Sequence, residues 1–226
     1  MTSSIRLVIF DLDGTLVDAY PAIVSSFNHV MQALGLPPQP EALIRRSVGW
    51  GDTNLLKPFV QPGRLSKALK LYRKNHAAAL TQGTRFLPGA KELLRILKKK
   101  GCQLAVASNR PTKFSYIILE HLKMREYFDD VLCGDRLKKG KPHPEIILRI
   151  LKRLSIRPEE ALFVGDMTVD VEAGRRAGVR TIVVLSGSST RQEIKKLKPY
   201  KIIKNILEVE KILTSIVFDS RSNSRW

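Results

Sequence analysis

Short apolar runs alternate with longer amphipathic segments through most of the chain, and this alternation sharply narrows the possible folds. Runs bounded by polar residues or glycine predict buried strands. They cover residues 5–10, 102–107, 130–133, 161–165 and 180–185. Between them, leucine and isoleucine recur at helical spacing, which predicts helices over 89–100, 112–122, 144–154, 169–177, 190–197 and 205–215. Strands that alternate with helices indicate an α/β fold on a mostly parallel, doubly wound sheet.

Residues 19–85 break this alternation. They contain no run typical of a strand, and they predict helices over 20–34, 40–48, 51–59 and 64–80, separated by turns that contain proline and glycine. We therefore expect an all-helical insert, with nine basic residues and two acidic ones. The expected division of the chain is an α/β core of residues 1–17 and 86–216, a helical cap of 18–85, and a flexible, polar C-terminal tail of 217–226.

Composition excludes several classes of protein. The chain has 226 residues, of which 43% are hydrophobic and 27% charged; this is enough to bury a core and unlike a disordered tail, a collagen or a coiled coil. No apolar run approaches the roughly 18 residues of a membrane span, and the first residues do not resemble a secretion signal. The two cysteines lack metal-binding spacing. We expect a cytoplasmic protein with reduced thiols and no membrane association.

The formal net charge of +18 raises the question of a nucleic-acid partner. Basic clusters lie at 98–100, 138–141 and 195–198, but each adjoins an amphipathic segment, where solvated lysines are common. Aromatic residues make up 7% of the chain and do not alternate with these clusters, so no stacking platform for bases is indicated. A nucleic-acid partner is therefore not expected, whereas the positive field favours small anions such as phosphate esters.

Two aspartates follow the first predicted strand, in the segment Asp11-Leu12-Asp13-Gly14-Thr15. Residues two apart in an extended segment face the same side, and doubly wound sheets bind ligands at the carboxyl ends of their strands. A close pair of carboxylates needs a cation or a proton between them, and oxygen ligands suit Mg²⁺. The alternative interpretation is an Asx turn or a helix cap.

Polar side chains also follow the other predicted strands. Ser108 and Asn109 come before a helix, whose free N–H groups can bind phosphate; an ordinary N-cap is the alternative. Lys141 precedes another helix N-terminus, which is unfavourable for a cation unless an anion lies nearby; it is otherwise a solvated loop lysine. Asp166 can bind the same metal, with Asp170 one helical turn along the same face; the alternative is a capping Asp166 followed by an exposed helix residue. In a doubly wound sheet these segments all meet at one crevice, so their joint occurrence predicts a single site.

These four segments resemble the motifs of the haloacid-dehalogenase-like hydrolases. The resemblance rests on DLDGT at 11–15, Ser108 after a strand, Lys141 in KPHPE, and GDMTVD at 165–170, and it extends over residues 5–213. The helical insert resembles the C1-type cap of that superfamily, and the chain is most similar to its phosphoglycolate phosphatases and related pyrophosphatases. The resemblance implies a Rossmann-like core and Mg²⁺ as cofactor. Arg110 departs from the family pattern, which often has lysine there.

The resemblance implies hydrolysis of a small, phosphoglycolate-like phosphate monoester through an aspartyl-phosphate intermediate. In this hypothesis Asp11 is the nucleophile and Asp13 the general acid and base. Ser108 and Lys141 bind the phosphoryl oxygens. Asp170 orients Lys141 or metal-bound water.

The metal ligands implied by the resemblance are Asp11, the main-chain carbonyl of Asp13, and Asp166. Further residues are expected to bind the phosphate or the rest of the substrate. They are Thr15, Asn109 and Arg45, with Arg46 or the turn at Gly49–Gly51 as other contacts to the far end of the substrate.

Several alternatives remain open at the level of the sequence. The same superfamily contains pyrophosphatases and phosphosugar mutases or phosphatases. A dehalogenase or a phosphonate-cleaving enzyme is disfavoured, because Asp13 would have no leaving oxygen to protonate. A basic nucleic-acid-binding protein on an inactive scaffold is the remote alternative, and the intact acidic residues disfavour it. The sequence carries no indication of the oligomeric state, which stays unknown, or of whether the cap is open or closed.

Overall fold

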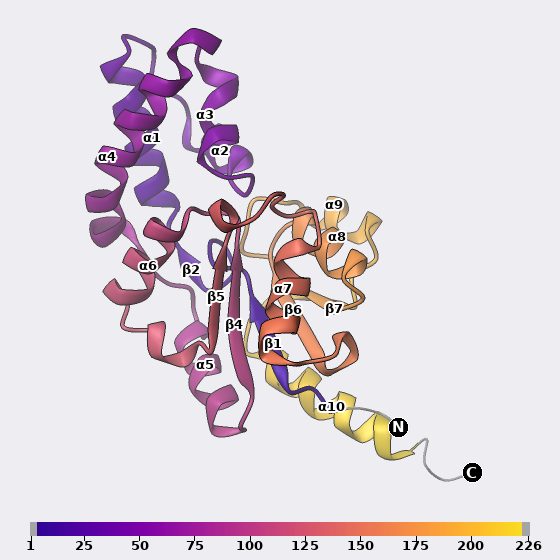
Figure 1. The fold of residues 1–226 in the computed structure, drawn as a ribbon. Coiled ribbons are helices and arrows are strands. Elements are labelled where there is room, and N and C mark those ends of the chain that lie inside the picture. Colours follow the sequence, from indigo (N-terminus) through magenta and orange to yellow (C-terminus); the bar gives the residue numbers. More distant parts are fainter. Residues whose placement is uncertain (1–3, 223–226) are drawn as a thin grey trace.

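A central parallel sheet organises the computed structural model, which describes residues 4–222 of the chain (Figure 1). The strand order is β5-β4-β1-β6-β7-β8, and every pairing is parallel. The strands are β1 Leu7–Phe10, β4 Gln103–Ser108, β5 Asp130–Cys133, β6 Ala161–Gly165, β7 Arg180–Val184 and β8 Lys201–Ile203. Because β1 lies between β4 and β6, the loops that follow these three strands are neighbours at the carboxyl edge.

Both faces of the sheet are covered by helices, as expected for a doubly wound fold. The alternation of side chains along β1 shows the two layers: Val8 and Phe10 face one hydrophobic cluster, and Leu7 and Ile9 face another. All four are fully buried. The helices are α5 Ala90–Lys99, α6 Thr112–His121, α7 Glu145–Leu154, α8 Thr168–Arg176, α9 Arg191–Lys196 and α10 Glu208–Ser222.

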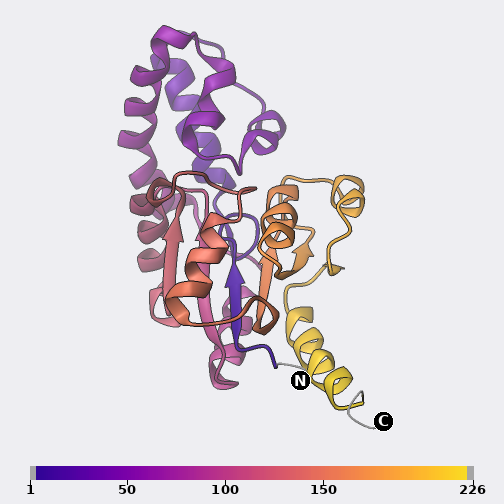
Figure 2. The same ribbon diagram turned by 45° about the vertical axis from the view of Figure 1, so that its right-hand side comes forward.

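The helical insert lies beyond the carboxyl ends of the strands, at the top of Figures 1 and 2. Its helices are α1 Tyr20–Ala33, α2 Glu41–Ser47, α3 Asp52–Leu56 and α4 Leu65–Gly83. Helix α1 packs along α4, and α4 also contacts α6 of the core. The chain enters and leaves the insert through two short antiparallel strands, β2 Val17–Asp18 and β3 Arg85–Phe86. The insert is therefore connected to the core through a two-stranded ribbon, beyond the carboxyl edge of the sheet.

The structure confirms the predicted α/β class and nearly every predicted element, with three differences. The helix expected over 51–59 is α3 followed by a 3-10 turn at Lys57–Phe59, because Pro58 cannot donate an N–H to an α-helix. The short strands β2, β3 and β8 were not expected. The last helix, expected over 205–215, begins at Glu208 and continues to Ser222, so it enters the segment expected to be a tail.

Two smaller expectations concern the C-terminal tail and the start of the insert. The end of the expected tail, residues 223–226, lies outside the described residues. Asp18 was expected to cap the first helix of the insert; Ala19 holds the N-cap position, but Asp18 Oδ1 accepts the backbone N–H of Tyr20 at 3.2 Å. Among the described helices, none combines the length and the apolar character that crossing a bilayer requires.

Candidate active site

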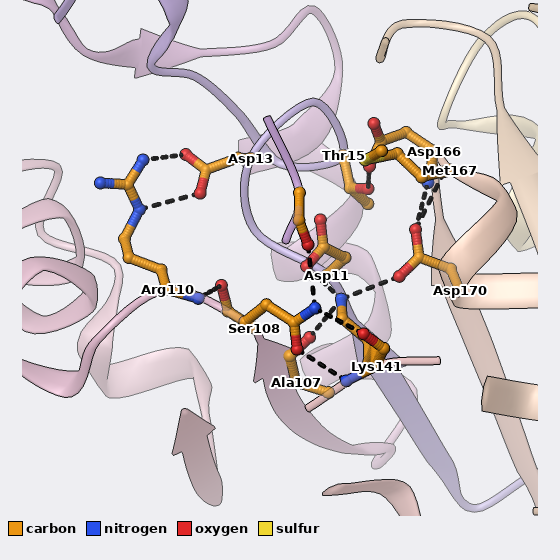
Figure 3. Close-up of polar contacts among 12 residues, drawn as sticks. Asp11, Asp13, Thr15, Ala107, Ser108, Arg110, Lys141, Asp166, Met167 and Asp170 are labelled. Atoms are coloured by element: carbon orange, nitrogen blue, oxygen red, sulfur yellow. Dashed lines mark hydrogen bonds and ion pairs between the residues drawn. The ribbon is translucent and has the colours of Figure 1, made fainter. Parts of the chain in front are cut away.

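The polar residues that follow β1, β4 and β6 meet at the carboxyl edge of the sheet (Figure 3). Asp11 comes directly after β1, Ser108 ends β4, and Asp166 follows β6. The backbone N–H of Asp11 donates to Val164 O at 2.9 Å, which continues the ladder between β1 and β6 to this point. The side chains are thus placed by rigid strand ends, and all three are buried.

Lys141 is the cation at the centre of this group. Its ammonium donates to Asp11 Oδ1 at 2.5 Å, to the carbonyl oxygen of Ala107 at 2.8 Å and to Asp170 Oδ1 at 2.8 Å. The side chain is only 2% exposed. Burial alone would lower the pKa of Lys141, but the carboxylates of Asp11 and Asp170 raise it above its ordinary value. The lysine is therefore a fixed positive charge, not the solvated loop lysine that was the sequence alternative.

The site contains more acidic side chains than the single ammonium of Lys141 can balance. Burial raises the pKa of Asp11 to about 6, with Lys141 opposing the rise and Asp170 adding to it. Burial, and then the charge of Asp11, also raises the pKa of Asp166 well above its ordinary value. Three buried carboxylates and one ammonium leave an excess of negative charge in a water-poor place, which a bound cation would relieve.

The donor set fits a small divalent cation such as Mg²⁺. One carboxylate oxygen from each of Asp11, Asp166 and Asp170 lies within 4.8 Å of the others. Asp166 Oδ1 accepts the hydroxyl of Thr15 at 3.0 Å, whereas its buried Oδ2 has no hydrogen-bond partner among the described residues. A buried, unpartnered carboxylate oxygen is costly unless a cation or a proton satisfies it.

Both carboxylate oxygens of Asp170 accept hydrogen bonds from the protein. Its Oδ1 accepts from Lys141, and its Oδ2 accepts the backbone N–H groups of Asp166 and Met167 at 3.1 and 2.9 Å. Asp170 therefore orients both Lys141 and the loop that carries Asp166. The alternative from the sequence, an exposed helix residue, does not hold, because Asp170 is buried.

The backbones of two glycines pack closely against Asp166 Oδ2. A Cβ atom at Gly187 would lie only 1.5 Å from Asp166 Oδ2, and one at Gly14 would lie 2.6 Å from it. Gly14 also has a φ of +80°, which favours glycine. The backbone thus approaches the carboxylate more closely than any side chain permits. Gly187 was not identified from the sequence, because it belongs to a loop after β7 with no motif of its own.

Asn109 forms hydrogen bonds with the backbone of two other loops. Its Oδ1 accepts the backbone N–H of Lys141 at 2.7 Å, and its Nδ2 donates to the carbonyl oxygens of Lys141 and Gly49, both at 2.9 Å. Ser108 Oγ accepts the backbone N–H of Arg110 at 3.1 Å. Asn109 therefore sets the backbone position of Lys141, and its predicted contact with phosphate stays a prediction, as does that of Thr15.

Asp13 points away from Asp166 and toward Arg110 (Figure 3). Arg110 Nε and Nη2 donate to the two carboxylate oxygens of Asp13 at 2.8 and 2.7 Å. The third side of the guanidinium, Nη1, lies 2.6 Å from Nε2 of His76 on α4. The sequence marked Arg110 only as a departure from the family pattern and did not single out His76. A signal for it exists, because Ala68, Tyr72, His76 and Leu80 recur every four residues along the buried side of α4.

A cavity opens from Asp11 and Lys141 toward the insert. Apart from the polar groups described above and Asp52, its walls are largely apolar, and Gly49 and Gly51 also line it. The apolar lining residues are Ile23, Val48, Leu55, Tyr72, Pro111, Phe114, Met167 and Val169. At Gly49 the backbone fits closely against Met167, because a Cβ there would lie 2.3 Å from the methionine sulfur.

The two arginines named from the insert lie outside the cavity lining. Arg45 stacks on the ring of Tyr20, 3.8 Å from its centroid, and pairs with Glu41 at 3.3 Å. Arg46 crosses from the insert to the core, where it pairs with Glu193 at 2.7 Å and donates to the carbonyl oxygen of Ser188. The structure does not bring Arg45 to Asp11 and Lys141, and its substrate contact stays a prediction.

Comparison with known proteins gives consistent results. A family model described as haloacid dehalogenase-like hydrolase matches residues 8–184. The chain is 31% identical over 217 residues to phosphoglycolate phosphatase 1 of Pseudomonas aeruginosa, covering 90% of this chain and 78% of that protein. It is 35% identical over 182 residues to a phosphoglycolate phosphatase of Aquifex aeolicus, covering 80% and 85%.

A solved structure shares the fold. A crystal structure described as a predicted phosphoglycolate phosphatase from Haemophilus somnus 129pt superposes with a TM-score of 0.88 and 28% identity, covering 94% of this chain and 99% of the other. The family match spans the segments that carry Asp11, Ser108, Lys141 and Asp166. The chain therefore belongs to the haloacid dehalogenase-like hydrolase family.

Proposed function

We propose that this protein is an Mg²⁺-dependent phosphatase that hydrolyses a small, phosphoglycolate-like phosphate monoester through an aspartyl-phosphate on Asp11. The observation that carries the proposal is the position of Asp11. Its carboxylate is buried at a strand end, contacts the ammonium of Lys141, and adjoins a second acid with a free oxygen. The names of the relatives, phosphoglycolate phosphatases, support the substrate class.

Asp11 is the nucleophile in this proposal. One of its carboxylate oxygens attacks phosphorus while the bond to the leaving oxygen breaks, so that the phosphoryl group is transferred to the aspartate. Lys141 favours the ionised form of Asp11 that this attack requires, and it places a positive charge beside the phosphoryl oxygens. The Ser108 hydroxyl donates a further hydrogen bond to the phosphoryl group.

Asp13 serves both halves of the reaction. It first gives a proton to the leaving oxygen, and its carboxylate then takes a proton from the water that attacks the aspartyl-phosphate. The oxygen of this water becomes part of the released phosphate, and the carboxylate of Asp11 is regenerated. The pairing of Asp13 with Arg110 keeps this side chain directed into the cavity between core and insert.

Asp11 and Asp166 would hold Mg²⁺, together with the main-chain carbonyl of Asp13, and the ion would offset the negative charge of nucleophile and phosphoryl group. Thr15 and Asp170 keep Asp166 in place for this purpose through the hydrogen bonds described above. The helical insert, residues 18–85, acts as a cap that excludes bulk water from the site.

The apolar walls and the Gly49–Gly51 turn favour a small leaving group. A phosphate-release assay distinguishes the possible substrate classes. The compounds to compare, each with and without Mg²⁺, are phosphoglycolate, inorganic pyrophosphate, sugar phosphates and nucleotides. We expect the highest kcat/KM for a short phosphomonoester. Turnover of a β-phosphosugar without phosphate release would instead indicate a mutase.

The direct test is Asp11→Asn. The amide cannot attack phosphorus, so Mg²⁺-dependent phosphate release should fall by at least about a thousandfold, while circular dichroism shows an unchanged fold. The matched control is Asp130→Asn, which removes a carboxylate that pairs with Arg153 on the surface and should leave turnover unchanged. Full activity of Asp11→Asn would exclude Asp11 as the nucleophile.

A further inference from the structure

A chain of hydrogen bonds runs from Asp13 in the core to a histidine in the insert. Arg110 donates two hydrogen bonds to Asp13, and its Nη1 approaches His76 Nε2 at 2.6 Å. On the other side of the imidazole, Nδ1 lies 2.9 Å from Oγ of Ser26 on α1. Ser26 Oγ in turn donates to the carbonyl oxygen of Ala22 at 2.8 Å. Every polar atom of His76 is thereby engaged.

This arrangement determines which ring nitrogen carries the proton. The single hydroxyl proton of Ser26 goes to Ala22 O, so Ser26 Oγ accepts at its other side and His76 Nδ1 is the donor. Nε2 is then a lone-pair acceptor, and a guanidinium can only donate. The Nδ1–H tautomer is therefore the one that satisfies Ser26 and Arg110 together.

The surroundings of His76 keep its ring neutral. The side chain is fully buried, stacked on Tyr72 with ring centroids 4.6 Å apart and in edge contact with Phe114 at 5.0 Å. Burial and then the charge of Arg110 lower the pKa of His76 to about 2. A neutral imidazole offers Arg110 an acceptor at Nε2.

The guanidinium has no other anchor on that side among the described residues. Its Nε and Nη2 donate to the carboxylate of Asp13, so Arg110 is held between Asp13 on one side and His76 on the other. His76 belongs to α4 of the insert, whereas Asp13 and Arg110 belong to core loops after β1 and β4. The position of the Asp13 carboxyl thus depends on the insert being seated against the core.

We propose that His76 is a positioning residue for the general acid: by holding Arg110, it places the Asp13 carboxyl for proton transfer to the leaving oxygen. The inference rests on the proposed phosphatase function. In the step concerned, the P–O bond to the leaving group breaks, its electron pair goes to the leaving oxygen, and that oxygen takes the proton from Asp13. The Asp13 carboxylate that results is the form that accepts both N–H bonds of Arg110.

The test compares two esters that differ in their need for a proton. The leaving group of 2-phosphoglycolate is an alkoxide and requires an acid, whereas the 4-nitrophenolate of 4-nitrophenyl phosphate leaves without one. We expect His76→Phe to lower kcat/KM for phosphoglycolate by roughly tenfold to a hundredfold and to change that for 4-nitrophenyl phosphate by less than about threefold. His76→Gln, whose amide oxygen can accept from Arg110, should restore most of the loss.

A second variant covers the case in which His76→Phe does not fold. Ser26→Ala removes the acceptor that selects the His76 tautomer and should reduce kcat/KM selectively for phosphoglycolate, by a smaller factor. The control is His29→Phe, at an exposed position on α1, which should leave both esters unaffected.

The possible outcomes separate the inference from the proposed function. An equal loss for both esters in folded His76→Phe or Ser26→Ala, or no loss for either, would overturn the positioning role while leaving the phosphatase intact. If the wild-type protein releases no phosphate from either ester with Mg²⁺ present, the proposed function fails and the inference falls with it.

Discussion

Lys141 Nζ lies 2.8 Å from Asp170 Oδ1, and the same ammonium contacts Asp11 and the carbonyl oxygen of Ala107. One buried side chain therefore joins the ends of β1 and β4 to the start of α8. Removal of a buried cation from such a group leaves carboxylates without a partner, and this cost exceeds that of breaking an exposed ion pair.

Replacement of Lys141 by methionine should accordingly affect both stability and turnover. Without Mg²⁺ we expect the free energy of unfolding to fall by about 3 kcal/mol, and phosphate release to be lost. Urea unfolding in EDTA measures the first effect. Lys99→Met, at an exposed position on α5, is the control and should change stability by less than about 0.5 kcal/mol. Equal stabilities of the two variants would contradict the role assigned to Lys141.

Gly187→Ala tests the space around Asp166. The new Cβ would lie 1.5 Å from Asp166 Oδ2, so the carboxylate must move away from the place where the cation is expected. The Mg²⁺ concentration needed for half-maximal activity should rise by about tenfold or more. Gly63→Ala is the matched control, because nothing lies within 4 Å of a Cβ there. A Mg²⁺ requirement unchanged in Gly187→Ala would argue against Asp166 as a ligand.

Stability without Mg²⁺ should decrease as the pH rises. The pKa of Asp11 is raised from 3.8 to about 6 by burial, and that of Asp166 is raised as well. The folded chain therefore binds more protons than the unfolded chain between these values, and the free energy of unfolding falls through that window. Mg²⁺ binds the ionised carboxylates, so its stabilising effect should grow with pH.

Unfolding midpoints in urea at about pH 5 and about pH 8, each with EDTA and with excess Mg²⁺, measure this dependence. Asp11→Asn should flatten it, since the amide does not titrate. A stabilisation by Mg²⁺ that is the same at both pH values would show that the acidic cluster does not bind the ion.

Arg46 links the insert to the core through Glu193 and the carbonyl oxygen of Ser188. If this contact favours the seated insert, Arg46→Ala should raise KM by roughly two- to fivefold, the range expected for one exposed ion pair, without lowering kcat. The difference between wild type and variant should shrink at high salt. Lys70→Ala, exposed on α4 of the same insert, should leave KM unaltered. A fall in kcat with constant KM would point to a different role for Arg46.

The strand ends could be predicted because their signal is local. Asp11, Ser108 and Asp166 each come directly after an apolar run, and a parallel sheet brings such positions to one edge. Lys141 and Asp170 also follow from local motifs. For Asp170 the sequence predicts either a contact with Lys141 or metal-bound water, or an exposed position on a helix; the side chain is buried and accepts from Lys141 and from N–H groups of its own loop.

Other contacts of the site could not be predicted, because they join residues that are distant in the sequence. The contact between His76 and Arg110 joins residues that are 34 positions apart in the chain and belong to different parts of the fold. Gly187 matters because a distant carboxylate packs on it. Strands β2 and β3 have two residues each, too few for an alternating pattern to emerge from the sequence.

Those two short strands have a consequence for how this kind of enzyme diversifies. Val17 pairs with Phe86 and Asp18 with Arg85, so the insert begins and ends at adjacent points, and its length can vary without disturbing the register of the main sheet. Substitutions and insertions between these junctions can reshape the cavity between insert and core, while Asp11, Ser108 and Asp166 remain fixed at the strand ends. New substrate preferences can thus evolve while the core stays unaltered. They can also be engineered by grafting a foreign insert at positions 17 and 86.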